Sequence, residues 1–434
     1  MSEIRETPVP YRIWGEDQIE PGALAQMKAA AELPISVQGA LMPDAHQGYG
    51  LPIGGVLATE GALIPYAVGV DIACRVKLTV FDASPHVLGQ KREKFRQIIE
   101  ENTVFGAGVG FSQREGHAVM DDPVFGTLDI ARQYKDTAWK QLGSSGSGNH
   151  FVEFGQLTVH TPIAGTGDLE GEGSRTFGAI PPGKYLALLS HSGSRGLGFN
   201  IANHYTQIAM SLHPDLPKAH RHLAWLDIQS AEGQEYWLAM NLAGRYASAN
   251  HAVIHRRIID AVRFDVLGGI ENHHNFAWKE VHDGNEVFIH RKGATPAGKG
   301  VYGVIPGTMM DPGFVVLGKG EPASLTSAAH GAGRQMSRGQ AFRRFDWENV
   351  DRQLKRAGVD LLSAGLDESP GAYKDIHTVM AAQADLVEAV GEFQPLLVKM
   401  DADKKSRQRK SERSGSPDRK RYKESKKDKR RKNR

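Results

Sequence analysis

The order of apolar and polar residues predicts a chain in which helices and strands are mixed. Helical spacing of apolar residues predicts helices over residues 21–33, 86–102, 129–141, 232–264, 346–357 and 376–391. Short or alternating apolar runs predict strands over residues 76–81, 151–154, 185–190, 286–290, 301–317 and 395–399, and we expect the first of them to be half-buried. His251 and His255 share the helix over 232–264, and we expect both at the surface because no glutamate follows His251 as in a zinc-protease helix.

The segments between these elements are rich in glycine. Glycine and proline predict a sharply folded loop over residues 42–50, in which Asp44 and His46 are candidates either for chemistry or for a simple turn. Residues 162–182 are polar and predict an exposed excursion. The chain has 49 glycines, many of them in such loops, which favours function carried by loops on a β-rich scaffold.

Composition excludes some classes of protein and separates two parts of the chain. The sequence has no apolar run of the roughly 18 residues needed for a membrane span, and residues 1–14 lack the apolar core of a secretory signal. A single cysteine predicts a reducing, cytoplasmic setting. The net charge of +3 hides 17 Lys/Arg and 6 Asp/Glu in residues 401–434, against 36 and 44 in residues 1–400. We therefore expect one folded domain over 1–400 and a basic, disordered tail over 401–434.

The single cysteine, Cys74, lies three residues after Asp71, at the entrance to the predicted strand 76–81. By itself this pair fits a buried packing cysteine better than a metal ligand. Histidines in Gly- or Asn-rich settings follow in four later segments, at His150, His191, His274 and His330. Together these islands predict one metal site built from distant loops. Thiolate and imidazole favour zinc, whereas a bridging thiolate with a carboxylate also suits two manganese ions.

Cations accompany these islands at Arg195, Lys292, Arg338 and Lys399. Glycine-rich loops let backbone amides approach phosphate. Metal ions, cations and such loops together predict phosphate chemistry, because metal ions neutralise the charge that develops during phosphoryl transfer. A histidine outside the ligand set would serve as a nucleophile that divides one transfer into two easier steps.

Eight motifs occur in order between Met42 and Lys399. They are Met-Pro-Asp-x-His-x-Gly-Tyr-Gly, Gly-x-Asp-Ile-x-Cys, Gly-Asn-His-Phe, His-Ser-Gly-Ser-Arg-Gly-Leu-Gly, His-His-Asn, His-Arg-Lys-Gly-Ala, Pro-Gly-Thr-Met and His-Gly-Ala-Gly-Arg-x-Met-Ser-Arg. In these motifs the chain resembles the GTP- and manganese-dependent RNA-splicing ligases of the RtcB family. The resemblance implies a single large α+β domain, with a β-rich core, surrounding helices and a deep cleft that holds two metal ions.

The resemblance also implies an activity, in RNA repair or tRNA splicing. The family joins RNA ends bearing a 3′-phosphate or 2′,3′-cyclic phosphate to ends bearing a 5′-hydroxyl. GTP is the cosubstrate, two Mn2+ ions (or Zn2+ or Co2+) are the cofactors, and an archease-type activating protein is an expected partner. His330 would take GMP from GTP and pass it to the RNA 3′-phosphate, and the 5′-hydroxyl would then displace it.

The same resemblance implies the roles of particular residues. The metal ligands would be Asp71, Cys74, His150, His191 and His274, with Cys74 bridging both ions. The nucleotide would be held by Asn149, His150, Glu153, His274, Asn275, Pro306, Gly307, Thr308, Met309, His330, Gly331, Ala332, Gly333 and Lys399. The RNA phosphates would be gripped by Arg195, Lys292 and Arg338.

Four positions depart from the family pattern. Arg75 and Lys77 stand where the family usually has glycine and arginine, and Met310 and Gly313 stand where it usually has glycine and a nucleotide-contacting serine. The last two departures motivate an alternative function, a metal-dependent phosphoesterase that processes RNA 2′,3′-cyclic phosphate ends without ligation. A non-catalytic protein that binds RNA through its tail is a third hypothesis. The tail itself would either bind RNA through phosphate charge or only solubilise the chain.

Overall fold

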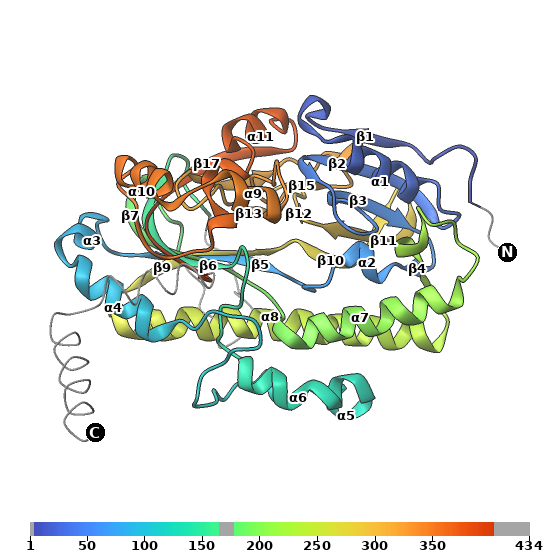
Figure 1. The fold of residues 1–434 in the computed structure, drawn as a ribbon, viewed down its shortest axis with the longest axis horizontal. Helices are drawn as coiled ribbons and strands as arrows, with labels where there is room; N and C mark the ends of the chain where they lie inside the picture. Colours follow the sequence, from blue (N-terminus) through green and yellow to red (C-terminus); the bar gives the residue numbers. More distant parts are fainter. Residues whose placement is uncertain (1–3, 165–177, 403–434) are drawn as a thin grey trace, which may run out of the picture.

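The computed structural model describes residues 4–164 and 178–402, which form two main sheets and a layer of long helices (Figure 1). The mixture of helices and strands confirms the predicted α+β class. The predicted tail, beyond residue 402, and residues 165–177 of the predicted excursion lie outside the described residues.

The larger sheet carries the core of the molecule. Its strands run in the order β13 (Tyr302–Ile305), β14 (Gly313–Gly318), β17 (Val387–Met400), β6 (Phe151–Val159), β7 (Gly183–Ser192), β5 (Arg75–Phe81) and β9 (Val266–His273), with β16 (Asp360–Ser363) parallel to β17. The sheet curls so that its two end strands approach each other, and there the Asn272 side chain on β9 donates to the Val304 carbonyl on β13 and accepts the Val304 amide. Apolar side chains such as Val76, Leu78 and Leu189 fill the interior.

The smaller sheet continues directly from the larger one. Its order is β1 (Tyr11–Ile13), β2 (Ser36–His46), β3 (Ile53–Thr59), β11 (Asn285–Lys292) and β10 (Asn275–His282). Two short pairs, β4 (Ala62–Leu63) with β8 (Leu226–Asp227) and β12 (Ala294–Pro296) with β15 (Ser327–Ala329), complete the strands. The chain leaves the larger sheet at His273 and enters the smaller one at Asn275. His274 therefore lies at the junction between the two sheets.

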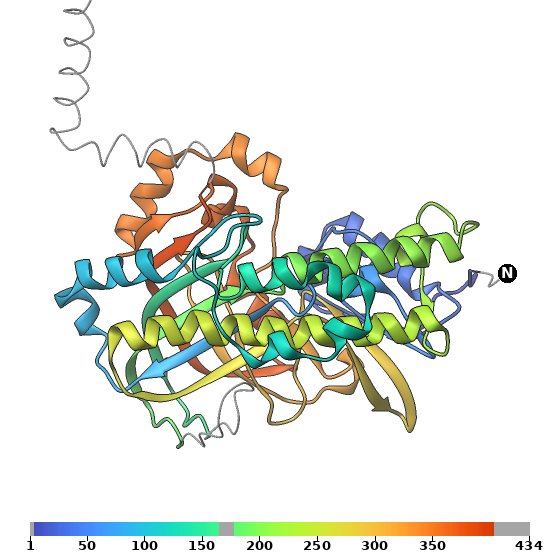
Figure 2. The same ribbon diagram turned by 90° about the horizontal axis from the view of Figure 1, so that it is seen from below.

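Two long helices, α7 (Arg195–Leu212) and α8 (Ala231–Val262), cover one side of the sheets (Figure 1). The other helices of the described residues are α1 (Pro21–Ala31), α2 (Pro65–Val68), α3 (His86–Gln90), α4 (Arg92–Asn102), α5 (Val124–Thr127), α6 (Asp129–Gln141), α9 (Arg338–Arg344), α10 (Trp347–Arg356) and α11 (Ile376–Ala382). Seen from below, α7 and α8 run side by side, with α5 and α6 packed outside them (Figure 2). Among the described residues, no helix has both the length and the apolar character that crossing a bilayer requires.

The structure confirms several predicted elements and corrects others. The helices predicted over 129–141 and 232–264 are α6 and α8. The helix predicted over 86–102 is divided into α3 and α4. The helix predicted over 376–391 ends at Ala382, and the last strand, β17, already begins at Val387. The loop predicted over 42–50 starts as strand, because β2 extends to His46.

Strand β5 shows the largest correction. It is buried along its whole length rather than on one face, because helix α8 covers its polar side. His251 and His255, which we expected at the surface, lie on that covered side with exposed fractions of 0% and 1%. Ser190 Oγ lies 3.0 Å from His251 Nδ1 and 2.8 Å from His255 Nε2. These hydrogen bonds between the helix and the sheet explain why the two imidazoles are tolerated in the interior.

Candidate functional site

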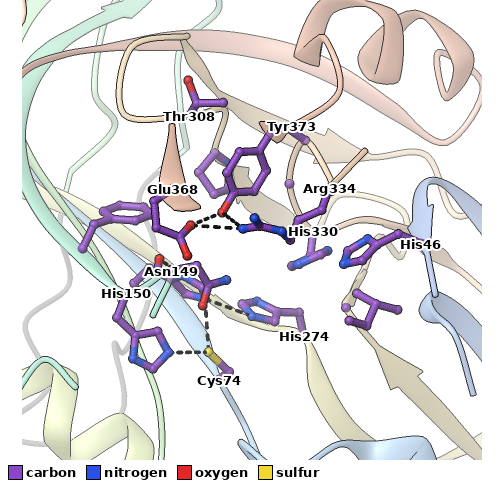
Figure 3. Close-up of a pocket in the computed structure, with 18 of the residues that line it drawn as sticks. His46, Cys74, Asn149, His150, His274, Thr308, His330, Arg334, Glu368 and Tyr373 are labelled. Carbon is purple, nitrogen blue, oxygen red and sulfur yellow. Dashed lines mark hydrogen bonds and ion pairs between the residues drawn. The ribbon is translucent and has the colours of Figure 1, made fainter. Parts of the chain in front are cut away.

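A cavity of about 910 Å³ opens where the two sheets meet. Its wall includes Cys74 just before β5, Glu153 on β6, His191 on β7, Lys292 on β11 and His330 just after β15. Segments that are distant in the sequence therefore share one cavity, as the histidine islands predicted. Figure 3 shows how these side chains approach one another.

A tight turn brings Asp71 and Cys74 together. The Cys74 amide donates to the Asp71 carbonyl at 3.1 Å, and Ala73 between them has a φ of 55°, a left-handed conformation that is unusual outside glycine. The Ala73 amide donates to the Asn275 carbonyl at 2.6 Å, which ties the turn to β10. Gly193 is required opposite this turn, since a Cβ there would lie 2.4 Å from the Asp71 carboxylate.

Asp71, Cys74 and His150 form one triad of candidate metal ligands. His150 Nε2 lies 3.1 Å from Asp71 Oδ2 and 3.5 Å from Cys74 Sγ. Asp71 Oδ1 also accepts the Ser194 amide at 3.0 Å, which fixes the carboxylate at the start of α7. Figure 3 shows His150 and Cys74 facing each other at the base of the cavity.

Cys74 also belongs to a second triad, with His191 and His274. His191 Nε2 lies 3.1 Å from Cys74 Sγ and 3.2 Å from His274 Nε2. The other nitrogen of His191, Nδ1, lies 3.1 Å from the Asn149 carbonyl, so a proton on Nδ1 leaves Nε2 free for a ligand. One sulfur atom is therefore shared by two sets of three donors.

Burial sets the protonation states of these groups. Burial lowers the pKa of His150 and His191, and the neighbouring charge of Arg195 adds to the effect at His150. Burial would raise the pKa of Asp71, but the hydrogen bond with His150 and the charge of Arg195 outweigh it and hold that pKa well below its ordinary value. Two neutral imidazoles beside an ionised carboxylate are the states that cation ligation requires.

The donor set fits metal ions. In each triad the candidate atoms lie within 4.8 Å of one another, as expected for ligands of one ion. Each triad leaves coordination positions for a substrate, in contrast to a closed structural site. The structure thus brings together all five predicted ligands, with Cys74 common to both sets.

His330 lies at the edge of this group and is held by Asp44. Its Nδ1 lies 2.7 Å from Asp44 Oδ2, and its backbone amide donates to the same oxygen at 3.2 Å. The His330 ring is 4.8 Å from the His274 ring, centroid to centroid. Asp44 is fully buried, and Lys374 fixes its strand by donating to the carbonyls of Pro43 and Ala45. Gly333 allows this packing, since a Cβ there would lie 2.0 Å from the Asp44 carbonyl oxygen.

Most residues predicted to bind the nucleotide line the cavity. They are Asn149, His150, Glu153, His274, Asn275, Pro306, Gly307, Thr308, Met309, His330, Gly331, Ala332 and Gly333. Glu153 is only 4% exposed, and burial raises its pKa well above the ordinary value. A buried carboxyl group that faces a cavity is suited to recognise a ligand with paired N–H donors.

The structure places three of the predicted site residues differently from the others. Lys399 does not line the cavity, because its ammonium group turns away to the Thr103 carbonyl at 3.2 Å. Arg195 also lies behind the cavity wall, where it donates to His150 Nδ1 at 2.9 Å and lies 3.6 Å from Asp71. Asn275 lines the cavity, but its side-chain amide already bonds the Asp71 carbonyl and the Gly293 amide. It therefore braces the ligand turn.

The two remaining predicted cations do face the cavity. Lys292 donates to the Tyr49 carbonyl, and burial lowers its pKa to about 7. Arg338 is 45% exposed and forms ion pairs with Asp367 and Glu368. Lys292 and Arg338 thus place two cationic side chains on the cavity wall, and each could exchange its present oxygen partner for a phosphate.

The sequence reasoning missed a cluster around Glu368. Arg334 lies 3.4 Å from Glu368 and donates to the Tyr373 hydroxyl at 3.1 Å, and Tyr373 in turn donates to Glu368 (Figure 3). The adjacent carboxylates Asp367 and Glu368, between β16 and α11, were the only sequence signal, and such pairs are common without a function. The cluster holds Arg338 at the cavity mouth.

The two cations that depart from the family pattern lie beneath the metal ligands. Arg75 and Lys77 both pair with Glu271, and the contact to Lys77 is 2.8 Å. Arg75 also donates to the Ala73 carbonyl at 3.2 Å and to the Gly244 carbonyl on α8 at 3.0 Å. This buried network supports the ligand turn from below and connects it to the long helix.

The chain matches proteins of one family along most of its length. A family model described as tRNA-splicing ligase RtcB matches residues 26–124 and 124–401. The RNA-splicing ligase RtcB1 of Escherichia coli is 32% identical over 417 residues, which cover 88% of this chain and 95% of that protein. The tRNA-splicing ligase RtcB of Thermococcus kodakarensis is 30% identical, with 89% and 94% covered, and the RNA-splicing ligase RtcB of Mycobacterium bovis is 33% identical, with 86% and 99% covered. The resemblance carried by the eight motifs is confirmed, and the chain belongs to the RtcB family of RNA-splicing ligases.

Proposed function

We propose that this protein is a GTP-dependent RNA ligase that joins ends bearing a 3′-phosphate or 2′,3′-cyclic phosphate to 5′-hydroxyl ends, in RNA repair or tRNA splicing. The relatives named above are RNA-splicing or tRNA-splicing ligases, which supports RNA ligation as the reaction. The observation that carries the proposal is the pair formed by His330 and Asp44, which borders two sets of metal donors in one cavity.

His330 is the proposed nucleophile. With its Nδ1 proton donated to Asp44, the lone pair on Nε2 is available to attack the α-phosphorus of GTP. The N–P bond forms as the bond to pyrophosphate breaks, which leaves GMP on His330. The RNA 3′-phosphate then displaces the imidazole, and finally the RNA 5′-hydroxyl attacks the activated phosphate and releases GMP. A cyclic phosphate must first be opened by water.

Glu153 is proposed to select the base. Burial alone favours the protonated form, but two N–H donors would stabilise the carboxylate, which would then accept hydrogen bonds from N1–H and N2–H of guanine, a pair of donors that adenine lacks. The site for the remainder of the nucleotide is formed by Asn149, by residues 306–309 and by residues 331–333, whose backbone amides can approach phosphate.

Asp71, Cys74 and His150 would hold one metal ion, and Cys74, His191 and His274 a second. We propose Mn2+ at both, with Zn2+ or Co2+ as alternatives, because the set mixes sulfur, nitrogen and oxygen donors. Bound ions would neutralise the charge that develops on the reacting phosphates. A cytoplasmic, reducing setting would keep Cys74 available as a ligand.

The remaining proposed contacts concern RNA and partners. Arg338 and Lys292 would bind the phosphates that flank the reacting ends, with Arg338 exchanging its carboxylate partners for phosphate. Residues 1–400 would form the catalytic domain, and the basic residues 401–434 would add charge-based affinity for RNA. An archease-type protein is a proposed activating partner.

The proposal is tested by incubating the protein with α-labelled GTP and Mn2+ and then with RNA ends. We expect an acid-labile label on the protein, absent from His330→Ala, and joined RNA only when a 3′-phosphate or cyclic phosphate meets a 5′-hydroxyl. Label from ATP equal to that from GTP would contradict the role of Glu153. Absence of label with every metal would contradict the proposal itself.

One observation supports the alternative function, a phosphoesterase. Gly313 lines the cavity without a side chain, so it offers a nucleotide none of the contacts that a serine would offer there. The same assay separates the two functions. A phosphoesterase would open 2′,3′-cyclic phosphates without GTP and without joined product.

A further inference from the structure

An exposed aromatic ring, Tyr49, stands at the cavity in front of two half-buried rings. Tyr49 follows β2, lines the cavity and is 68% exposed, which is unusual for so large a ring. Two other rings support it from behind. The centroid distances are 6.3 Å to Tyr66 on α2 and 5.8 Å to His222, which lies between α7 and α8. Tyr66 and His222 are themselves 5.2 Å apart, so the three rings form one connected cluster, called the aromatic shelf below.

The backbone fixes the position of the shelf. Gly50, with a φ of 68°, brings Tyr49 so close to the loop carrying His222 that a Cβ at Gly50 would lie 2.6 Å from the His222 carbonyl oxygen. From the other side, Lys292 donates to the Tyr49 carbonyl and places its ammonium group 5.8 Å from the Tyr66 ring centroid. Tyr49 is therefore held on a rigid support while its own ring remains in solvent.

The shelf is continuous with the catalytic group. Lys292 is followed by Gly293, and a Cβ at Gly293 would lie 3.1 Å from the His330 ring. Asp44, which holds His330, lies five residues before Tyr49 on the same segment. A nucleic acid whose reacting phosphate lies at His330 would therefore pass Lys292 on its way to Tyr49. Exposed aromatic rings beside a cation are the usual means of binding single-stranded RNA bases.

We propose that the aromatic shelf is a stacking site for the RNA base nearest the reacting end, with Tyr49 as the ring in contact. This inference rests on the proposed RNA ligase function and adds to it a base-binding subsite outside the metal and nucleotide residues. Stacking does not require a particular base, because every base has a π face, so the subsite grips an RNA end without reading its sequence.

The test compares Tyr49→Ala, Tyr49→Phe and Trp139→Ala with the unaltered protein. Trp139 is a partly exposed ring on α6 that does not line the cavity, and it serves as the control. We expect Tyr49→Ala to raise KM for RNA about tenfold or more, while labelling of His330 by GTP stays unchanged. Tyr49→Phe should keep the unaltered KM, because the hydroxyl is not needed for stacking.

An abasic substrate shows whether the ring contacts a base. Two RNA substrates are compared, one lacking the 3′-terminal base and one lacking the 5′-terminal base of the other strand. The substrate that lacks the stacked base should raise the KM of the unaltered protein as much as Tyr49→Ala raises the KM for intact RNA. That substrate should raise the KM of Tyr49→Ala no further, and it therefore identifies the RNA end whose base is bound. The inference is overturned if Tyr49→Ala labels His330 normally and binds RNA normally, or if it remains sensitive to both abasic substrates. Failure of GTP labelling in the unaltered protein would instead overturn the proposed function.

Discussion

Asp44 and His330 are 286 residues apart in the sequence, yet Asp44 Oδ2 lies 2.7 Å from His330 Nδ1. The same oxygen accepts the His330 backbone amide, so one carboxylate sets both the place and the tautomer of the imidazole. Neither residue belongs to either of the two donor triads found among the described residues. This division separates the proposed nucleophile from the metal ligands.

Replacing Asp44 tests that division. We expect Asp44→Ala to slow guanylylation of His330 by about 100-fold or more, because the imidazole loses the acceptor that fixes its orientation and its Nδ1–H tautomer. The rate of label transfer from GTP measures the effect, and metal content should not change. Asp385→Asn, a surface carboxylate bonded to Trp14, is the control and should label at the normal rate. Loss of bound metal in Asp44→Ala would contradict the separation of roles.

Replacing Cys74 tests the shared ligand. We expect Cys74→Ser to lose both ions, since the sulfur belongs to both triads, whereas His191→Ala should weaken chiefly one. Metal analysis after gel filtration gives the stoichiometry directly, without reference to activity. His160→Ala, an exposed histidine at the end of β6, should bind metal like the unaltered protein. Full retention of two ions by Cys74→Ser would show that the sulfur does not bridge.

Lys292 predicts a dependence on pH. Burial lowers its pKa to about 7, so in the free protein the ammonium form exists below that pH and is lost as the pH rises through it. We expect kcat/KM for RNA to fall across this window, because the neutral amine no longer attracts phosphate. Lys292→Arg stays charged and should give a flat profile through the same range. A profile with the same step in both proteins would assign the titration to another group.

Glu271 predicts a dependence of stability on the buried network. Burial would raise the pKa of Glu271, but Lys77 and Arg75 outweigh it and hold that pKa well below its ordinary value of 4.5. Its contribution is therefore complete above about pH 4.5 and is lost as the pH falls further. We expect Glu271→Gln to lower the free energy of unfolding by roughly 3–5 kcal/mol at pH 7, because two buried cations lose their partner.

Urea unfolding at pH 7 and at pH 4 measures this loss. Between the two pH values the variant should lose less stability than the unaltered protein, since it lacks the titrating group. Glu286→Gln removes a surface ion pair to Lys279 and should cost at most about 1 kcal/mol. Equal effects of the two variants would mean that the buried network contributes little.

Deleting residues 401–434 tests the proposed role of the basic tail. We expect normal labelling of His330 and weaker RNA binding, with a smaller slope of log affinity against log salt, because the deletion removes a net charge of +11. Binding measured at several salt concentrations gives the slope. An unchanged slope would leave the tail with a solubilising role only.

Local patterns predicted much of the fold but not the interactions between distant elements. Helix α8 follows from apolar spacing within one segment, and so was found with nearly correct limits. His251 and His255 were misplaced because their partner, Ser190, belongs to a strand that the periodicity of one helix does not reveal. Position 399 was likewise correct as strand, but the direction of its side chain depends on the carbonyl of Thr103, which the local pattern does not reveal.

The candidate site was predictable where a motif brought several residues together. Asp71, Cys74 and the three histidines converge as the resemblance implied. Asn275 shows what a motif does not reveal, because its side-chain amide already bonds the backbone of Asp71 and Gly293. The sequence names the residue types around a cavity, and the hydrogen bonds decide which of them are free to meet a ligand.

The sulfur common to both triads gives the metal centre one point of chemical vulnerability. Without ions, burial and the nearby Asp71 carboxylate raise the pKa of the Cys74 thiol, which keeps it protonated and slow to react with peroxide. A loaded centre would hold the same atom as thiolate. Oxidation of that one atom would disable both ion sites together, so an oxidising stress that damages RNA would also stop its repair until the thiol is restored.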